Sequence, residues 1–220
     1  MSRMIPALAF LIILNGCSGS EYVKSDFDYK QTTPHKIALV PVLQNLPVST
    51  DSSYATVLRN RDLDSEFLSP SRIRSLTDSL NARELIEAVL GLEPKSGERS
   101  KSRSLINHLD SSQMDHFREV CRGADLVFVP SQFSLKKSGG AVIGKVTHRL
   151  YDLQSGDLLY EKKESVNVMP GGILRTGGLI SALGAGSDIS ESNRPEASYA
   201  TTILAVNGIN NLRDKILVGE

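Results

Sequence analysis

Gly123-Ala124-Asp125-Leu126-Val127-Phe128-Val129-Pro130 is the stretch of this chain that decides its fold. A run of four apolar residues that ends at a proline is typical of a short strand buried on both faces of a sheet. The residues before Gly123 carry Met114, Phe117 and Val120 at helical spacing, and the glycine ends that helix. Upstream, residues 37–42 form a second strand of the same kind. A helix between two buried strands indicates a βαβ unit with layered packing and a right-handed crossover.

Downstream of this unit the periodicity changes. Residues 141–153 alternate over their second half, Gln154-Ser155-Gly156-Asp157 form a turn, and residues 158–166 return with enough charge to indicate one solvent-exposed face. Residues 197–217 carry an apolar stripe at helical spacing, so we expect this helix to cover a sheet face. The predicted fold is therefore α/β, a layered mixed sheet with helices packed on it that ends in a β-hairpin and a C-terminal helix.

Capping chemistry predicts further helices between the two buried strands. Residues 66–68 form a brief strand between the first two of them. The expected helices are residues 53–59 with Ser52 or Ser53 as the cap, a helix with Ser69 as the cap and Pro70 in its first position, residues 82–90 ending at Gly91, and a helix capped by Asp110 or Ser111.

The first seventeen residues have the layout of a secretory signal. Arg3 precedes an apolar run of residues 5–14, which is half of the roughly 20 residues that a membrane-spanning helix needs. The run closes with Leu14-Asn15-Gly16-Cys17, which resembles the lipobox of bacterial lipoproteins. We therefore expect residues 1–16 to be a cleaved signal peptide and Cys17 to carry a diacylglycerol. The alternative is an ordinary signal peptide with a chance cysteine.

Lipidation has consequences for location. One acyl chain holds a protein only marginally at a membrane, but two or three chains on one cysteine hold it stably. Ser18 follows Cys17, whereas lipoproteins retained in the inner membrane typically carry aspartate there, so the resemblance implies the periplasmic face of the outer membrane. Residues 17–36 are then the lipidated cysteine and a tether, and residues 37–218 form the periplasmic domain.

Composition excludes several classes of partner. The chain has 25 basic and 25 acidic residues, and a balanced charge gives no reason to expect nucleic acid. It has no tryptophan, which argues against a site that stacks carbohydrate. With Cys17 lipidated, Cys121 is alone, so no intramolecular disulfide is available, and we expect a small buried apolar residue there.

The sequence shows no catalytic or metal-binding constellation. The four histidines are dispersed, and none pairs with a cysteine or carboxylate at metal-ligand spacing. We expect His116 to be a boundary residue between core and surface on the helix that carries Met114 and Phe117, and Asp152 to be bonded to turn amides. The sequence therefore predicts no enzyme, no cofactor and no metal, although an enzyme whose site is assembled from distant residues stays open.

Residues 169–187 form a glycine-rich insertion in the domain. Glycine this dense prevents a stable helix in water, while the apolar residues within it would be a liability if merely exposed. A loop folded over the domain and a contact with the membrane or a protein partner both stay open. A phosphate site is disfavoured, because the glycines do not lie between a strand and a helix. The candidate contact residues are Ile173, Leu174, Leu179, Ile180 and Leu183.

Two short sequence motifs resemble those of the CsgG-like lipoprotein superfamily. They are Gly123-Ala124-Asp125 before an apolar strand, and the hairpin Leu150-Tyr151-Asp152-Leu153-Gln154-Ser155-Gly156-Asp157-Leu158-Leu159. That superfamily includes the curli secretion channel subunit, the LpoB type of penicillin-binding-protein activator and the amino-terminal domain of TolB. The likeness covers roughly residues 27–217.

The resemblance implies a non-catalytic scaffold or accessory subunit of an envelope assembly that serves secretion or a surface structure. The partners would be the membrane, through the lipid, and an envelope protein, with self-association as a further option. The alternatives are an activator of a peptidoglycan synthase and a subunit of a pore-forming secretion channel. The pore is disfavoured, because only residues 139–168 alternate and Lys162-Lys163-Glu164 would be costly facing lipid.

Overall fold

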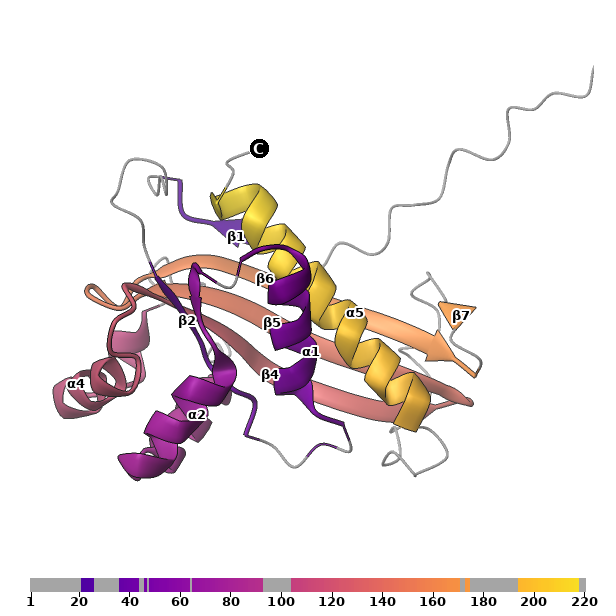
Figure 1. Ribbon diagram of the computed structural model, residues 1–220, viewed down its shortest axis with the longest axis horizontal. Helices are drawn as coiled ribbons and strands as arrows, with labels where there is room; N and C mark the ends of the chain where they lie inside the picture. The colour runs from indigo at the N-terminus through magenta and orange to yellow at the C-terminus, as the bar shows by residue number, and fades with distance from the viewer. Residues whose placement is uncertain are drawn as a thin grey trace, which may run out of the picture.

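Three long antiparallel strands form the centre of the sheet in the computed structural model (Figure 1). They are β4 (Leu126–Ser138), β5 (Ala141–Asp152) and β6 (Leu158–Met169). The structure describes residues 21–25, 36–43, 46, 48–63, 65–92, 104–170, 173–174 and 194–217.

Short strands extend this centre on both sides. β2 (Ile37–Leu39) pairs in parallel with β4 and with β3 (Phe67–Leu68), which is the arrangement that a βαβ unit requires. β1 (Glu21–Val23) and β7 (Ile173–Leu174) both pair antiparallel with β6. The path through the sheet is β1-β6-β5-β4-β2-β3, with two open edges. The predicted mixed α/β fold is confirmed.

Strand β4 is longer than its sequence indicates. The apolar run stops at Pro130, yet the strand continues to Ser138 and forms a second hairpin with β5. The carbonyl of Phe128 accepts a hydrogen bond from Val40 on the β2 side, so the Pro130 nitrogen, two residues on, also faces that side. Because β2 has ended there, the missing N–H removes no ladder bond. Past the proline, Gln132 adopts φ 52° at a break in the register.

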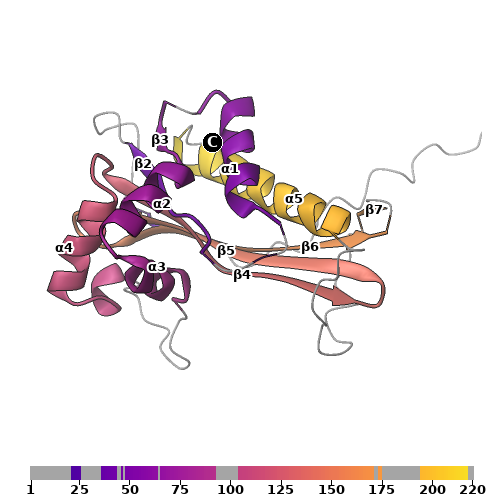
Figure 2. The same ribbon diagram turned by 60° about the horizontal axis from the view of Figure 1, so that its bottom comes forward.

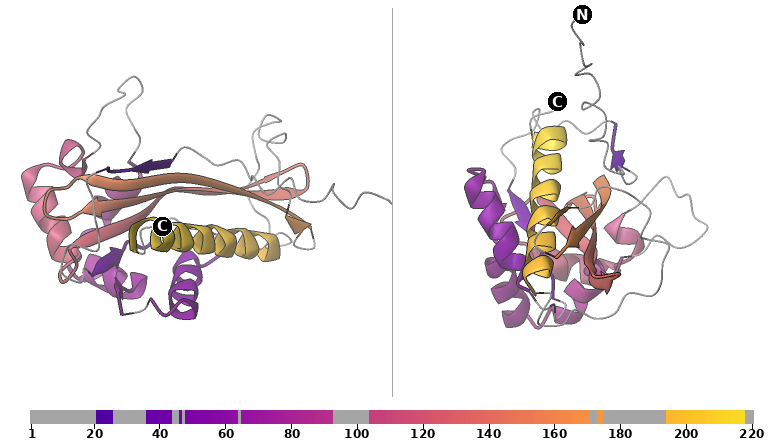
Figure 3. Two further views of the ribbon diagram at one scale, coloured as in Figure 1. Left: turned by 90° about the horizontal axis from the view of Figure 1, so that it is seen from above. Right: turned by 90° about the vertical axis from the view of Figure 1, so that its right-hand side faces the viewer.

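The helices lie on both faces of the sheet (Figures 2 and 3). On one face, α1 and α5 share a core with Phe128 and Leu150. On the other, α2, α3 and α4 share a core with Val127 and Val129. The bounds are α1 Thr50–Asn60, α2 Pro70–Ser79, α3 Arg83–Leu90, η2 Leu105–Asn107, α4 Ser111–Val120, α5 Arg194–Leu212 and η4 Arg213–Leu217, a π-helical last turn.

Helix α1 begins earlier than predicted. Its N-cap is Ser49, whose hydroxyl accepts a hydrogen bond from the Ser52 amide at 3.3 Å. The expected cap at Ser52 or Ser53 was wrong, because the hydroxyls of both residues instead donate back to the Ser49 carbonyl. A serine-rich stretch offers several equivalent caps, so its chemistry alone does not select one.

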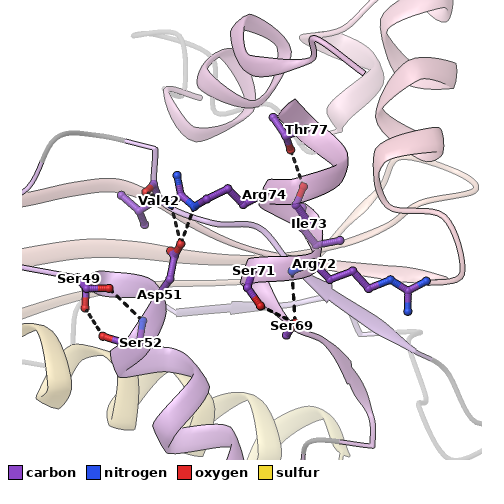
Figure 4. Close-up of polar contacts among 10 residues, drawn as sticks. All are labelled: Val42, Ser49, Asp51, Ser52, Ser69, Ser71, Arg72, Ile73, Arg74 and Thr77. Atoms are coloured by element: carbon purple, nitrogen blue, oxygen red, sulfur yellow. Dashed lines mark hydrogen bonds and ion pairs between the residues drawn. The ribbon is translucent and has the colours of Figure 1, made fainter. Parts of the chain in front are cut away.

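Arg74 ties α2 to the elements beside it. Figure 4 shows its guanidinium between Asp51 on α1 and the backbone after β2. Its Nε and Nη2 donate to the Asp51 carboxylate at 2.9 and 2.6 Å, and Nη2 also donates to the Val42 carbonyl at 3.0 Å. The side chain of Arg72 points away from these contacts, into solvent.

Several local predictions are confirmed. Ser69 caps α2 with Pro70 in its first position, α3 ends at Gly91, and Asp110 caps α4 in a reciprocal capping box with Gln113. The carboxylate of Asp152 accepts from two turn amides at 2.7 Å.

Cys121 is fully buried at the end of α4, and burial raises the pKa of its thiol to about 12. The thiol is therefore an apolar core group, as its surroundings in sequence indicated.

The predicted wet face of the return strand β6 is confirmed, because Lys163 and Ser165 face solvent on one side of the strand. Lys162 and Glu164 lie on the other side beneath α5, with side chains 17% and 6% exposed. Charged residues therefore stand on both faces of this strand, and those under α5 need partners inside the protein.

The helices cover the two faces unequally. Helix α5 packs across β5 and β6, as predicted for a C-terminal helix that covers a sheet face (Figure 3). The core on the opposite face covers only the end of the sheet that contains Leu153 and Leu158. The other half of the long hairpins extends beyond α2, α3 and α4 (Figure 2). None of the helices in the described ranges has the length and apolarity that a membrane span requires.

Candidate functional site

Ionisable side chains gather between the sheet and α5. Pairing across β5 and β6 sets His148 opposite Lys162 and Val146 opposite Glu164, which puts these charged residues on one face. Tyr54 reaches the same place from α1, and Asn211 reaches it from α5. We call His148, Glu164, Tyr54, Asn211 and Lys162 the buried polar cluster.

His148 is the centre of this cluster and is fully buried. Its ring stacks on Phe128 with the centroids 5.3 Å apart, and its Nε2 shares a hydrogen bond with the Tyr54 hydroxyl at 2.5 Å. Gly208 lies directly over the ring on α5, where the Cβ of any other residue would overlap the imidazole. This glycine lets α5 approach the histidine closely.

Glu164 is held from both sides. The Asn211 amide donates to its Oε1 at 2.6 Å, and the Asn211 carbonyl oxygen accepts from Lys162 at 3.0 Å. Lys162 also lies 3.8 Å from the carboxylate of Glu21 on β1. One amide on α5 thus bridges the cation and the anion of β6.

Burial sets the protonation of this cluster. It lowers the pKa of His148 to about 3, assisted by the charge of Lys162, so the imidazole is neutral. Burial raises the pKa of Glu164 to about 7 against the favourable hydrogen bond from Asn211. Burial, then the charge of Glu164, holds the pKa of Tyr54 well above its usual value.

Hydrogen bonding within the cluster is incomplete. His148 Nδ1 and Glu164 Oε2 are buried without a hydrogen-bond partner and lie 3.8 Å apart, too far for a hydrogen bond. The hydroxyl of Tyr160 beside them is likewise unpartnered. An imidazole beside a carboxyl group of raised pKa has the chemistry of an acid–base pair. Since His148 is 0% and Tyr54 2% exposed, however, no substrate reaches it without movement of α5.

A second ionic group lies on the other face of the same strands. Arg149 and Glu161 are both buried, and the guanidinium Nε donates to the carboxylate at 2.8 Å. Its Nη1 donates to the Leu92 carbonyl at 2.7 Å and to the Ser131 hydroxyl at 2.8 Å. This group, the arginine network, fastens the segment after α3 to the sheet.

The far half of that face carries a group of exposed lysines. Lys136, Lys145 and Lys163 lie on the three long strands, on the side away from α5, and the register places Ser134 and Ser165 beside Lys145. None of these lysines has an ion-pair partner among the described residues, and the far halves of β4, β5 and β6 contribute no acidic residue to this side. We call these three residues the lysine face.

The residues singled out in the sequence lie elsewhere. Ile173 and Leu174 form β7, which pairs with Val168 and Met169 at the outer edge of β6. Cys17, Leu179, Ile180 and Leu183 lie outside the described residues, as does most of the glycine-rich segment. The structure therefore neither joins these residues into one site nor separates them.

Sequence reasoning treated the histidines as dispersed and so missed the buried polar cluster. Counting back from the turn at residues 154–157 pairs His148 with Lys163, whereas the register shift between Leu150 and Tyr151 pairs it with Lys162, so the sequence pattern did not indicate this pairing. Tyr54 and Asn211 could not be found either, since they arrive from distant helices. Within the described ranges, no group of three histidine, cysteine or acidic residues is placed to hold a metal ion.

Comparisons with known proteins give no family assignment. No protein-family profile matches the sequence, and no curated protein matches it. Among solved structures, a hypothetical protein from Chlamydia trachomatis is similar with a TM-score of 0.41 and 10% identity, over 81% of this chain and 95% of that one.

Two further solved structures are similar. The PelC dodecamer from Paraburkholderia phytofirmans has a TM-score of 0.38 and 13% identity over 88% of this chain and 94% of that one. The C-terminal domain of LpoB from Salmonella enterica has a TM-score of 0.31 and 16% identity, over 61% and 84%. Likeness at this level assigns neither a family nor a function.

Proposed function

We propose that this chain is a lipid-anchored protein of the bacterial envelope that works by contacting other proteins, as a scaffold or accessory subunit of an envelope assembly. The observation that carries the proposal is the unequal cover of the sheet. Over the far half of the hairpins, one face is packed under α5 while the other presents the lysine face to solvent.

The lysine face has the properties of a contact surface. Its charges stand on strands, and strands hold side chains in a fixed array. Three cations with no acidic ion-pair partner among the described residues favour an acidic protein surface, because complementary charge speeds association and excludes wrong partners. The envelope partner is therefore a protein with a cluster of aspartate and glutamate residues.

Photo-crosslinking in intact cells tests this contact. A photoreactive residue at position 145 is expected to capture an envelope protein, whereas the same residue at Arg72, also exposed but on α2, is expected not to. Equal capture from both positions, or capture only from Arg72, would remove the lysine face from the proposal.

The anchor is a separate part of the proposal, and its support is the lipobox-like sequence that ends at Cys17. Membrane fractionation of Cys17→Ala tests it. Two acyl chains hold a protein stably at a membrane, so we expect the variant to leave the membrane fraction. Unchanged membrane association would refute the anchor.

The glycine-rich segment belongs to the proposal as a second contact. Its apolar residues Ile173, Leu174, Leu179, Ile180 and Leu183 are the candidates. Deletion of residues 171–186 should weaken recovery of the partner in a pull-down, and intact recovery would exclude the segment.

An enzyme is the second candidate function, and the buried polar cluster is the observation that favours it. The burial of His148 and Tyr54 counts against it, because α5 closes the approach. Glu164→Gln keeps the hydrogen bond to Asn211 but removes the titrating group, so it should leave the activity of the protein in cells unchanged. Loss of that activity with the fold intact would favour the enzyme.

The resemblance to the CsgG-like lipoproteins suggests two more specific functions, an activator of a peptidoglycan synthase and a subunit of a secretion channel. Stimulation of a purified synthase by the purified protein would select the first. Co-purification with a secretion complex would select the second.

A further inference from the structure

We infer that the edge of the sheet formed by β1 rests in the headgroup layer of the membrane, so that the domain stands on the bilayer by this edge. The inference rests on the proposed lipidation of Cys17 and adds a surface and an orientation to it.

The first argument is the length of the chain between the lipid and the sheet. Glu21 already pairs with Lys162, only four residues after Cys17. Four residues span at most about 14 Å when fully extended. A domain of roughly 200 residues has a radius of gyration of about 16 Å, so this leash is too short for the domain to turn its far side to the membrane.

The second argument is the chemistry of the edge. Tyr22 and Val23 are two of the four large apolar residues that stand exposed in the described chain, at 39% and 40%. The register puts Tyr22 beside Glu161 and Val23 beside Tyr160, so their side chains lie on opposite faces of the sheet. An approach by the edge is the one orientation that lets both reach the same layer.

The backbone limits how deep the edge can go. No strand in the described part of the chain pairs with the outer side of β1, because β1 ends the path through the sheet. Backbone groups without a strand partner are too costly in hydrocarbon but are satisfied among headgroups and water. Tyrosine is favoured at that depth, where its ring is in apolar surroundings and its hydroxyl is hydrated. The edge is therefore expected in the headgroup layer and not in the acyl core.

A third observation lies on the same edge. β7 pairs with the other end of β6 at Val168 and Met169, while β1 pairs with Tyr160 to Lys162. The backbone of β7 therefore lies on the same outer side of β6 as β1. The two short strands lie about 26 Å apart along β6, at about 3.3 Å per residue, so this edge is one continuous side of the sheet.

The absence of tryptophan from the chain allows a direct test. The variants are Tyr22→Trp and, as the matched control, Tyr199→Trp on α5, a tyrosine exposed to a similar degree at 43%. Each full-length mature protein is coupled through Cys17 to a maleimide lipid in phosphatidylethanolamine and phosphatidylglycerol vesicles. Cys121 is buried with its thiol protonated and does not compete. Coupling also separates this test from acylation in the cell, which the fractionation of Cys17→Ala measures.

The emission of Tyr22→Trp should shift to shorter wavelength on the vesicles and be quenched by lipids labelled near the headgroup more than by lipids labelled deep in the chains. Tyr199→Trp should show neither change. Equal quenching of both variants, or no quenching of Tyr22→Trp, would overturn the orientation while leaving the anchor in place.

Discussion

His148 and Arg149 are consecutive residues on β5, yet they occupy opposite kinds of polar interior. Arg149 points toward α3, where its guanidinium meets a carboxylate, a hydroxyl and a backbone carbonyl at 2.7 to 2.8 Å. His148 points toward α5, where its Nδ1 and the nearest carboxylate oxygen remain without hydrogen bonds. The α3 side is therefore closed by a satisfied ionic group, and the α5 side by an incomplete one.

This difference predicts how each side of the sheet responds to mutation and to pH. A satisfied buried network rigidifies the elements that it joins, whereas a partly satisfied one loses stability to every unpaired atom. We therefore expect the α3 side to respond to mutation as a structural clamp and the α5 side to respond to pH.

The largest effect is expected from breaking the clamp. Arg149→Met removes the guanidinium that donates to the buried carboxylate of Glu161, which should lower the free energy of unfolding by about 3 to 5 kcal/mol in urea denaturation. The double variant Arg149→Met, Glu161→Leu removes both charges and should recover most of this loss. A double variant as unstable as the single one would contradict the account.

The next effect is a pH dependence of the α5 side. The pKa of Glu164 is raised from 4.5 to about 7, so the folded protein holds this proton more tightly than the unfolded chain does. Its contribution to the free energy of unfolding should fall by about 3 kcal/mol as the pH rises from about 4.5 to 7 and should stay level above that pH.

Glu164→Gln isolates this contribution, because the difference in the free energy of unfolding between the wild-type protein and the variant should follow the same pH dependence. A difference that is constant from pH 4.5 to 8 would show that burial does not control this group.

A smaller effect is expected where α5 meets the histidine. Gly208→Ala should destabilise the protein by about 1 to 3 kcal/mol, because its Cβ overlaps the ring of His148. In the His148→Ala background the overlap is gone, and alanine should then stabilise the helix by about 0.5 to 1 kcal/mol. Thermal unfolding of the four proteins checks the change of sign, and the same sign in both backgrounds would refute the contact.

The smallest effect compares two buried tyrosines. Tyr54→Phe removes the hydrogen bond to His148 and should cost about 1 kcal/mol. Tyr160→Phe removes a hydroxyl that has no partner and should be neutral or stabilising. Chemical denaturation of both variants measures the two changes in the free energy of unfolding. Equal losses of stability would show that the hydrogen bond to His148 does not account for the effect of Tyr54→Phe.

The sequence predicted the layers of the fold because these follow from local chemistry. Periodicity found the buried strands and the helix over them, and caps such as Ser69 and Asp110 follow from side chains within three residues. The extension of β4 beyond Pro130 was missed, because it depends on where the neighbouring strand β2 ends. The local sequence of β4 contains no information about where a neighbouring strand ends.

The same limit explains the polar cluster and the edge. Tyr54 meets His148 across 94 residues of sequence, and no spacing rule connects them. Residues 21–23 read as part of a polar tether, yet they add a strand to β6. Both depend on contacts that form only when the whole sheet has assembled.

At the lysine face, the sheet is packed under α5 on one side and exposed to solvent on the other. The direct measurement is the amount of partner recovered with the lipidated protein after crosslinking in cells. Lys145→Glu with Lys163→Glu should lose the partner, while Arg72→Glu with Arg122→Glu, the same charge change on exposed helical and turn positions, and Glu164→Gln should retain it. Retention by the lysine variant, or loss in Glu164→Gln with its fold intact, would contradict a protein that works through this surface.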